Sequence, residues 1–252
     1  MNVLSIVTTY NRNTCLQRAI RFFLEQDYTG NHTMLIFNSG VETSLPDLQL
    51  PSNKDIYLVN KNISDKTNKA FTSVGQKHRE AFEAGYDYAD FDIVTHSDVD
   101  DIFFPNHISE GVKGMQKAYS MNKLGYKPKK SYCRVGNKIL LNENVYEPSM
   151  FIDVEFILDN KHLDNNVKYH DGWLLPLVQS NKLLVDEEGK PTFCYDWSGQ
   201  IPVYKMSGRP DDALNFALSQ STEVDTGNGL TEPITKEEAD TLYNLILNRV
   251  EK

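Results

Sequence analysis

Three acidic residues lie within four positions of one another, directly after an apolar segment of the sequence. The segment Phe91–Thr95 has the length and composition of a buried strand, and Asp98, Asp100 and Asp101 follow it. Carboxylates this close repel one another unless a cation lies between them. Because Mg²⁺ and Mn²⁺ prefer carboxylate and phosphate oxygens, the spacing favours a divalent metal that also binds a phosphorylated substrate. The alternative is that the acids cap the helix that follows or face solvent.

The elements around this acidic motif determine where it lies. Apolar segments of strand length alternate with segments of helical periodicity in the first half of the chain. Strands that alternate with crossover helices imply an α/β fold with a mostly parallel sheet, and ligands bind such sheets at the carboxyl ends of the strands. The predicted strands are Val3–Thr8, Met34–Phe37, Ile56–Val59 and Phe91–Thr95, and the predicted helices are Leu16–Phe23, Thr67–Ala84 (ended by Gly85) and one that begins at Pro105.

The second half of the chain has a less regular pattern. Phe151–Leu158 is compatible with a strand or with a helix, and both remain open. Asp171–Asn181 has helical spacing, and Thr192–Trp197 has the composition of a strand. Ser207–Pro233 is polar with several Gly and Pro residues, which is typical of a loop or lid, and a helix is expected from Thr235 onward.

Four segments resemble, in the same order, motifs of the family 2 glycosyltransferases, which are inverting enzymes with a GT-A fold. Val3–Arg12 resembles the opening strand of that family together with the loop that contacts the nucleotide. Phe23–Tyr28 resembles the LxQTYxN segment, and Met34–Gly40 resembles the strand that usually ends in Asp-Asp-Gly-Ser. Ile93–Asp101 resembles the strand and metal motif written fLDaDD. The resemblance covers residues 3 to 108 well and is patchy beyond them.

The resemblance implies a hexosyl- or pentosyltransferase that moves a sugar from a nucleotide-diphosphate sugar to an acceptor hydroxyl. We expect a UDP-sugar as the donor, inversion at the anomeric carbon, and Mn²⁺ or Mg²⁺ held by Asp98 and Asp100. Asn38 replaces an acid that often touches the base in the family, and Lys77 stands where alanine is usual. The implied donor-binding residues are Thr8, Thr9, Tyr10, Arg12, Asn38, Lys77 and Asp98.

The resemblance also implies the architecture and its boundaries. The fold class is α/β, a GT-A (Rossmann-like), mostly parallel sheet flanked by helices, with a C-terminal helical extension. Residues 1–206 would form the GT-A domain, with the nucleotide-sugar-binding half at 1–108 and the acceptor-binding half at 109–206. Residues 207–252 would form the loop or lid and the C-terminal helix.

In the family, the catalytic base is an acid at the start of a helix near the acceptor. The segment His170–Trp173 matches this pattern, so Asp171 is the candidate base, with Glu155 in reserve. An acid at a helix N-terminus is also an ordinary N-cap, which is the alternative. His170 and Asp196 are further candidate metal ligands, and Asp196 equally suits a surface acid at a strand end. Trp173 is a candidate for stacking on the acceptor, with core packing as the alternative.

The segment Gly111–Asn142, called the basic segment below, contains eight Lys or Arg residues and no Asp or Glu, in a chain of net charge −9. A strip of uncompensated cations creates a local field that selects partners. Lys127, Lys129 and Lys130 are therefore candidate acceptor-binding residues. The acceptor would then be polyanionic, such as hydroxymethylated DNA, or else a glycan. A solvated helix face followed by a basic loop is the alternative.

Two other functions fit parts of the sequence. Asp98-Val99-Asp100 after a strand also suits a phosphatase of the haloacid-dehalogenase type, although that class continues with Thr or Val where this chain has Asp101. A non-catalytic module that binds sugars or polyanions is the third possibility. The three cysteines are widely separated, which argues against a disulfide scaffold or a structural zinc site. We expect a cytoplasmic protein, because no apolar run approaches the roughly 20 residues of a membrane span and no signal peptide is recognisable.

Overall fold

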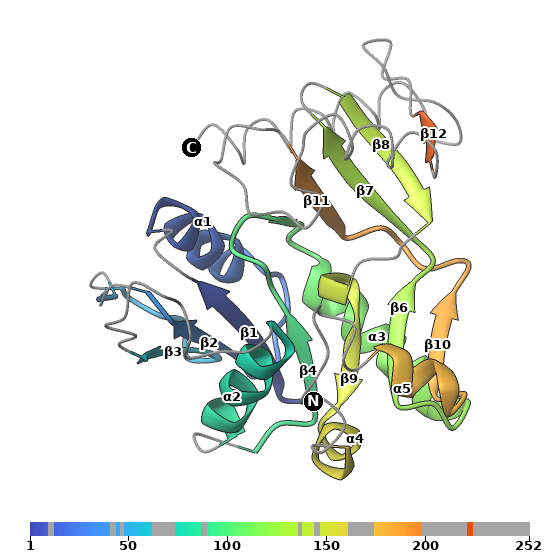
Figure 1. The fold of residues 1–252 in the computed structure, drawn as a ribbon, viewed down its shortest axis with the longest axis horizontal. Helices are drawn as coiled ribbons and strands as arrows, with labels where there is room; N and C mark the ends of the chain where they lie inside the picture. The colour runs from blue at the N-terminus through green and yellow to red at the C-terminus, as the bar shows by residue number, and fades with distance from the viewer. Residues whose placement is uncertain are drawn as a thin grey trace.

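The computed structural model describes residues 1–9, 13–40, 44–45, 48–61, 74–86, 90–135, 138–143, 147–160, 174–197 and 221–223, and the structural statements below concern these residues. Their strands form two sheets (Figure 1). The larger sheet has helices on both faces, and the smaller one lies above it in that view. In this part of the chain, no helix combines the length and the apolar character that crossing a membrane requires.

The larger sheet has seven strands in the order β10-β6-β9-β4-β1-β2-β3. Its neighbouring pairs are parallel except those of β9, which runs antiparallel to β4 and to β6. The mostly parallel sheet expected from the sequence is therefore confirmed, and β1 and β4 are adjacent. The strands are β1 (Val3–Thr9), β2 (His32–Asn38), β3 (Lys54–Asn60), β4 (Ile93–His96), β6 (Gly125–Pro128), β9 (Phe151–Asp153) and β10 (Leu183–Asp186).

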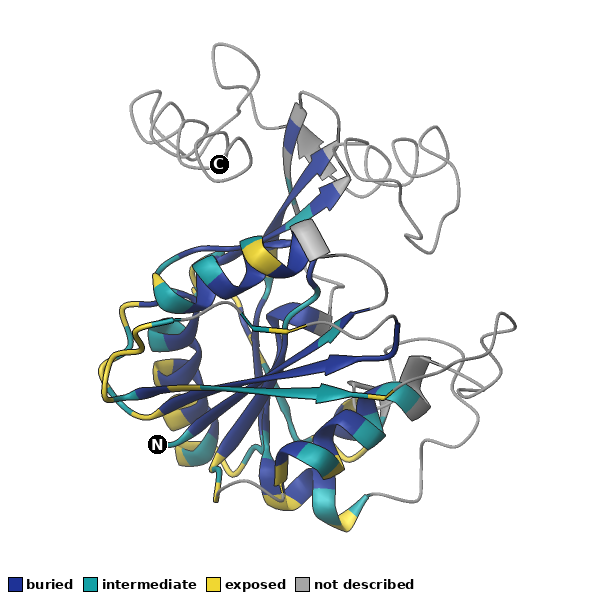
Figure 2. Cartoon of the chain, turned by 90° about the vertical axis from the view of Figure 1, so that its left-hand side faces the viewer, coloured by how far each residue is buried: buried dark blue, intermediate teal, exposed yellow. Residues whose placement is uncertain are grey.

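Helices cover both faces of this sheet because side chains alternate in direction along each strand and are apolar on both sides. One face carries Val7 and Ile93, and α1 (Asn13–Leu24) and α3 (His107–Ser120) pack against it. Figure 2 shows the consequence, since the central strands are buried between the layers.

The opposite face carries Leu4 and Ile6 and forms the second core layer. α2 (Val74–Tyr86) packs directly on β1 and β2. α4 (Val154–Asp159) and α5 (Leu174–Gln179) contribute apolar side chains to the same cluster. The result is a three-layer α/β arrangement in which the helices hold the carboxyl ends of β1 and β4 in place.

α3 lies very close to the sheet because two of its residues have no side chain. A methyl group at Gly111 would overlap the ring of Phe151 of β9, and one at Gly114 would overlap the ring of Tyr126 of β6. Both glycines are buried in the helix. The close packing of α3 on β9 and β6 therefore depends on glycine at these two positions.

The smaller sheet has five strands in the order β12-β8-β7-β11-β5 and was not predicted from the sequence, apart from the strand that became β11. β11 pairs in parallel with β7 and antiparallel with β5, and β5 is the strand that directly follows the acidic motif. Aromatic and aliphatic side chains of β5 and β11 pack with Phe22 of α1. The strands are β5 (Ile102–Phe103), β7 (Lys130–Val135), β8 (Lys138–Glu143), β11 (Phe193–Trp197) and β12 (Ser221–Glu223).

The structure resolves one alternative that the sequence left open and moves one expected helix end. The segment Phe151–Leu158, which suited either a strand or a helix, is a strand followed by a helix. β9 ends at Asp153, whose carboxylate accepts a hydrogen bond from the N–H of Phe156 at 3.0 Å and so caps the start of α4. The helix expected to end at Gly85 continues to Tyr86. Gly85 allows close packing instead, since a methyl group there would lie 2.9 Å from a δ-carbon of Leu4.

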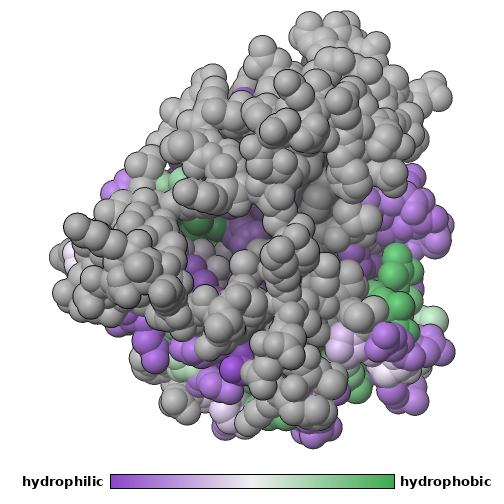
Figure 3. Space-filling model, in the orientation of Figure 1, coloured by the Kyte–Doolittle hydropathy of each residue, from purple (hydrophilic) through white to green (hydrophobic). Residues whose placement is uncertain are grey.

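In the described part of the chain, β10 forms one edge of the larger sheet. Val185 of β10 is 45% exposed, and Val178 of the adjacent α5 is 54% exposed. The hydrophobic patch at the right of Figure 3 lies over these two elements and is flanked by hydrophilic side chains. A few exposed apolar side chains of this kind are normal on a protein surface.

The expected loop or lid at 207–233 and the C-terminal helix lie outside the described residues, apart from the short strand β12. The first part of the predicted helix Asp171–Asn181 lies outside them as well, and α5 represents its second part. The boundary at residue 206 is therefore still a prediction.

Candidate active site

The residues Asp98–Asp101, called the acid turn below, form a tight turn at the carboxyl end of β4. The N–H of Ser97 donates to the carbonyl of Ile6 at 2.8 Å, which continues the pairing of β4 with β1 beyond the last strand residue. The N–H of Asp101 donates to the carbonyl of Asp98 at 3.2 Å and closes the turn. Asp98 is partly exposed, whereas Asp100 and Asp101 are buried.

The acid turn is attached to β11 and to α1 by polar contacts. The N–H of Asp196 in β11 donates to Oδ1 of Asp101 at 3.0 Å. Arg18 of α1 donates from Nη2 to the carbonyl of Asp100 at 2.7 Å and from Nη1 to Oδ2 of Asp196 at 3.3 Å. The buried carboxylate of Asp196 is thus balanced by a cation of the protein. The described structure therefore shows Asp196 as the ion-pair partner of Arg18, and its role as a metal ligand stays a prediction.

The oxygen atoms of the acid turn suit a hard divalent cation. Asp98 and Asp100 supply carboxylates, which Mg²⁺ and Mn²⁺ prefer. In the described ranges, no three His, Cys, Asp or Glu side chains are grouped in a way that could hold a metal by themselves. A cation at Asp98 and Asp100 would therefore take most of its ligands from water and from a phosphorylated substrate.

The end of β1 lies beside the acid turn and gathers several predicted donor-binding residues. Lys77 of α2 donates from Nζ to the carbonyl of Thr9 at 3.1 Å. Oγ1 of Thr8 lies 3.3 Å from Nε2 of His78, and the ring of His78 stacks on that of His96 with centroids 4.4 Å apart. The ammonium of Lys77 therefore lies at the sheet edge that carries the acid turn, where it can meet an anionic group.

Asn38 has a different place from the one expected of a base-reading residue. It is 2% exposed, its Oδ1 accepts from the N–H of Gly40 at 3.0 Å, and its Nδ2 donates to Oδ1 of Asn60 at 2.8 Å. The N–H of Ser39 donates to the carbonyl of Thr9 at 3.0 Å. Both ends of the Asn38 amide are used inside the protein, so the side chain fixes the turn after β2 against β1 and β3.

The reserve candidate base, Glu155, is contradicted by the sheet topology. β9 runs antiparallel to β4 with Asp153 opposite Ile93, and the N–H of Val154 donates to the carbonyl of Asp92 at 3.1 Å. Glu155 therefore lies beyond the amino end of β4, whereas the acid turn follows its carboxyl end. With a rise of about 3.3 Å per strand residue, the length of β4 separates the two sites. Tyr10, Arg12, His170, Asp171 and Trp173 lie outside the described residues.

Lys127, Lys129 and Lys130 do not form an open cationic surface. Lys127 is buried at 3% exposure. Nζ of Lys129 lies 2.7 Å from Oε2 of Glu187 and 3.3 Å from Oε1 of Glu143, and the hydrogen bond to Glu187 is the main cause that raises the pKa of Lys129. Lys130 is exposed. Of the three candidate acceptor contacts, Lys127 is thus buried, Lys129 is partly exposed but paired with acids, and Lys130 is exposed.

Other cations of the basic segment are also paired, with acids that lie outside the segment in the sequence. Nζ of Lys117 lies 2.8 Å from Oδ1 of Asp186, and that of Lys113 lies 2.7 Å from Oε1 of Glu110. Arg134 is buried at 5% exposure. The expectation of a strip of uncompensated cations is therefore wrong for Lys113, Lys117 and Lys129, each of which has an acid partner.

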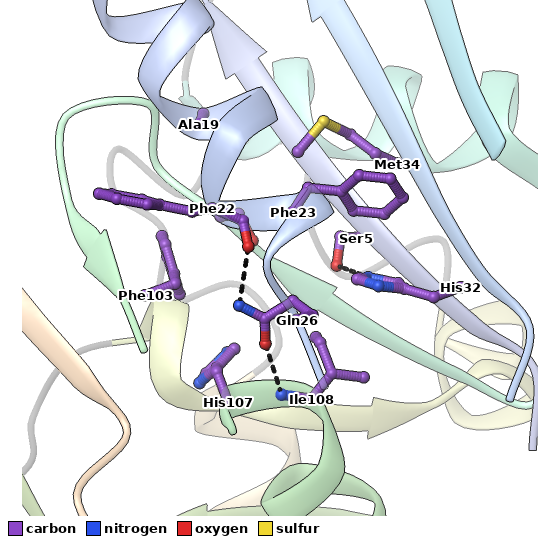
Figure 4. Close-up of a pocket in the computed structure, with 11 residues that line it drawn as sticks. Ser5, Ala19, Phe22, Phe23, Gln26, His32, Met34, Phe103, His107 and Ile108 are labelled. Carbon is purple, nitrogen blue, oxygen red and sulfur yellow. Dashed lines mark hydrogen bonds between the residues drawn. The ribbon is translucent and has the colours of Figure 1, made fainter. Parts of the chain in front are cut away.

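A small cavity is lined mainly by apolar side chains of α1, β2, β5 and α3 (Figure 4), and Ser97, the residue before the acid turn, also lines it. Gln26 crosses this region. Its Nε2 donates to the carbonyls of Phe22 and Phe104, both at 2.9 Å, and its Oε1 accepts from the N–H of Ile108 at 3.1 Å. One amide therefore joins the end of α1, the segment after β5 and the start of α3, which frame the acid turn.

Arg18 and Gln26 were not among the predicted site residues. Gln26 belongs to the segment that resembles LxQTYxN, so the resemblance contained a signal for it. Arg18 has no local signal, because its two partners are 82 and 178 positions away in the sequence. Such a contact follows from the tertiary fold alone.

No family model matches the sequence, and no curated protein matches it. Among solved structures, the chain is similar to Staphylococcus aureus TarS 1–349 in complex with UDP-GlcNAc, with 11% identity and a TM-score of 0.54 over 99% of this chain and 72% of that one. It is also similar to the mannosyltransferase PcManGT from Pyrobaculum calidifontis in complex with GDP-Man and Mn²⁺, with 14% identity and a TM-score of 0.55 over 98% of this chain and 70% of that one. The chain has the GT-A fold.

In these comparisons the similarity extends over nearly the whole of this chain. A longer TarS structure is similar at 13% identity and a TM-score of 0.52, and this chain matches 43% of its length. At identities this low, the likeness establishes the architecture, and the chemistry depends on the residues at the sheet edge. In the GT-A fold of this chain, those residues are the acid turn and the end of β1.

Proposed function

We propose that the protein is a metal-dependent glycosyltransferase that moves a sugar from a nucleotide-diphosphate sugar to an acceptor hydroxyl. The observation that carries the proposal is the acid turn at the carboxyl end of β4, beside the end of β1, in a GT-A fold. Ligand sites of open α/β sheets lie at this edge. The complexes of the similar structures with UDP-GlcNAc and with GDP-Man and Mn²⁺ support a nucleotide-sugar donor.

In this proposal, Asp98 and Asp100 hold Mn²⁺ or Mg²⁺, which neutralises charge on the departing diphosphate. Asp101 and Asp196 keep the turn attached to β11, as their 3.0 Å hydrogen bond indicates. Lys77 places a second positive charge on the donor side, since its ammonium lies at the end of β1. Preorganised charges of this kind stabilise the transition state because they need no rearrangement during the reaction.

The nucleotide is proposed to lie along the end of β1. Thr8 and Thr9 are the last residues of that strand, and Tyr10 and Arg12 follow them in the sequence. The turn after β2, which Asn38 fixes, forms the neighbouring wall. We propose a UDP-sugar as the first donor to test, with GDP-sugars next.

Asp171 is the proposed catalytic base. It would accept the proton of the acceptor hydroxyl as that oxygen attacks the anomeric carbon, with inversion of configuration as in family 2 enzymes. Trp173 would stack on the acceptor sugar, and His170 would lie beside the metal site. Glu155 has no part in this chemistry, because it lies at the amino end of β4.

A neutral glycan is the acceptor that the charges favour. A polyanionic acceptor needs several cations free to replace the counterions of its phosphates. Lys129 is instead paired with Glu143 and Glu187, and Lys117 is paired with Asp186. These pairs support the glycan over hydroxymethylated DNA.

A panel of nucleotide-sugars tests the proposal, with release of nucleoside diphosphate measured in Mn²⁺ and in excess chelator. Asp100→Asn should reduce the rate by about 100-fold or more, because a metal that stabilises the departing charge contributes several kcal/mol. Glu155→Gln is the matched control, since it removes an acid at the opposite edge of the same sheet and should leave the rate unchanged. Full activity in chelator would contradict the proposal. Covalent aspartyl-phosphate would identify the phosphatase, and donor binding without turnover would identify a non-catalytic module.

A further inference from the structure

Arg18 of α1 is the side chain that connects the acid turn to the rest of the molecule. Its Nη2 donates to the carbonyl of Asp100 at 2.7 Å, and its Nη1 donates to Oδ2 of Asp196 at 3.3 Å. Its guanidinium carbon lies 5.9 Å from the centre of the Phe22 ring, one turn further along α1. The Arg18 side chain is 12% exposed, so water competes little with these contacts.

The contacts of Arg18 form a closed circuit around Asp100. Arg18 binds the carbonyl of Asp100 and the carboxylate of Asp196, and the N–H of Asp196 binds the carboxylate of the next residue, Asp101. The backbone of Asp100 is therefore fixed on both sides. Because Arg18 uses the main-chain carbonyl, the circuit and a cation at the carboxylate would engage different atoms of Asp100.

The circuit also balances the charge of one of the three buried carboxylates in this region. Asp100, Asp101 and Asp196 are all buried, and buried like charges raise the energy of the folded state unless a cation balances them. Arg18 supplies that balance at Asp196. Its planar fork can bind the carbonyl and the carboxylate together, which a lysine ammonium cannot do in the same geometry.

We propose that Arg18 is a positioning residue for the metal site. It holds the backbone of Asp100 so that the Asp100 carboxylate meets the cation at the correct place, without touching the cation or the donor itself. α1, which carries Arg18, begins at Asn13, directly after residues 10–12 in the sequence, and these residues are proposed to contact the nucleotide. The inference rests on the proposed function for what the turn binds, and on the geometry for how the turn is held.

The test compares Arg18→Met with Arg21→Met. Arg21 lies on the same helix and its guanidinium carbon is 5.4 Å from the same Phe22 ring, but its ion pair goes to Glu25, the residue directly after α1, and not to the acid turn or to Asp196. Two quantities are measured in each variant. One is the hydrogen-exchange rate of the backbone amides of Asp98–Ile102 without ligand, and the other is the Mn²⁺ dissociation constant with UDP present, from the electron paramagnetic resonance signal of free Mn²⁺.

Arg18→Met should speed exchange in Asp98–Ile102 by about tenfold and weaken Mn²⁺ binding by about tenfold or more, the usual effect of losing a residue that orients a metal ligand. Arg21→Met should match the wild type in both measurements. Arg18→Lys should lie between them, because it keeps the charge and loses the fork. It also serves as the test variant if Arg18→Met does not fold.

Unchanged exchange in the Arg18 variants would overturn the inference, because the turn would then be held by other contacts. Faster exchange with wild-type Mn²⁺ affinity would also overturn it, since Arg18 would then be structural only. If the wild type binds no Mn²⁺ with UDP or with GDP, the proposed function fails instead. The exchange rates would still decide whether Arg18 holds the acid turn.

Discussion

His32 and His107 are buried histidines that stay neutral in the folded protein. Burial is the main cause that lowers the pKa of His32 well below its usual value, and burial lowers the pKa of His107 to about 3. Each ring keeps one polar contact. Nε2 of His32 lies 2.8 Å from Oγ of Ser5, and Nδ1 of His107 lies 2.9 Å from Oγ1 of Thr192. Neither ring can take up a proton without bringing a charge into the core.

This burial predicts a loss of stability in mild acid. Between pH 6.5 and about pH 3, the unfolded chain binds a proton at His107 that the folded chain does not, so the free energy of unfolding falls as the pH falls. The slope is about 1.4 kcal/mol per pH unit for each such histidine. Denaturant unfolding at pH 7, 6 and 5 measures it. His107→Gln should reduce the slope by about that amount, and an identical slope in the variant would show that His107 has the same pKa in the folded and the unfolded protein.

At the residue scale, the acidic motif could be predicted from the sequence, but its supporting side chains could not. Asp98 and Asp100 follow an apolar strand, which is a local pattern. Lys54 of β3 is a residue whose role no local pattern predicts. Its ammonium donates to the carbonyls of Leu24 at 2.6 Å and Gln26 at 2.8 Å and so caps the end of α1. A lysine in that role has the same sequence signature as any surface lysine.

At the element scale, α3 has the most specific packing requirement. Gly111 and Gly114 let the helix lie against the rings of Phe151 and Tyr126. Glycine inside a helix costs about 1 kcal/mol of stability relative to alanine. Two buried glycines therefore indicate that the close packing of α3 contributes more to stability than the helix propensity that these glycines lose. β9, which carries Phe151, is the strand next to β4, so the position of α3 also affects the strand that leads to the acid turn.

Gly111→Ala should therefore destabilise the protein, although alanine favours helices. Alanine gains about 1 kcal/mol in helix propensity over glycine. Overpacking against the Phe151 ring should cost about 1–3 kcal/mol, and the upper part of that range outweighs the gain. Thermal or denaturant unfolding measures the difference. Gln116→Ala, at an exposed position of the same helix, is the control and should change stability little. A more stable Gly111→Ala variant would show that Phe151 can move away without loss.

Two helix ends contain a signal that sequence inspection could have used. The chain reads Asn-Lys-Leu after α3 and again after α5, and Asn122 and Asn181 both have positive φ angles, of 56° and 55°. Asparagine is one of the few residues that accepts this conformation at a helix end. Nζ of Lys123 donates to the carbonyl of Asn181, and Nζ of Lys182 donates to that of Asn122. The repeated tripeptide thus marks two equivalent turns into β6 and β10.

At the scale of the whole molecule, the parallel sheet was predictable and the smaller sheet was not. β1, β2 and β3 are apolar segments whose periodicity is visible locally. β7 and all of β8 except its last residue lie in the basic segment, where charge suggested a partner-binding surface rather than a pair of strands. The charge pattern misled because Lys117 and Lys129 find acids near residue 186, far along the chain. Net charge per segment does not reveal pairs that form only on folding.

The acid turn is proposed to hold a divalent cation together with a nucleoside diphosphate. The most direct measurement is the melting temperature with UDP or GDP, in Mn²⁺ and in chelator, for the wild type and Asp100→Ala. At a ligand concentration about 100 times the dissociation constant, binding stabilises the folded state by about 2.7 kcal/mol, which corresponds to a rise of about 5–10 °C in a chain of this size. We expect this rise in the wild type only when nucleotide and Mn²⁺ are both present, and none in Asp100→Ala. No rise with either nucleotide, or an equal rise in Asp100→Ala, would contradict the account.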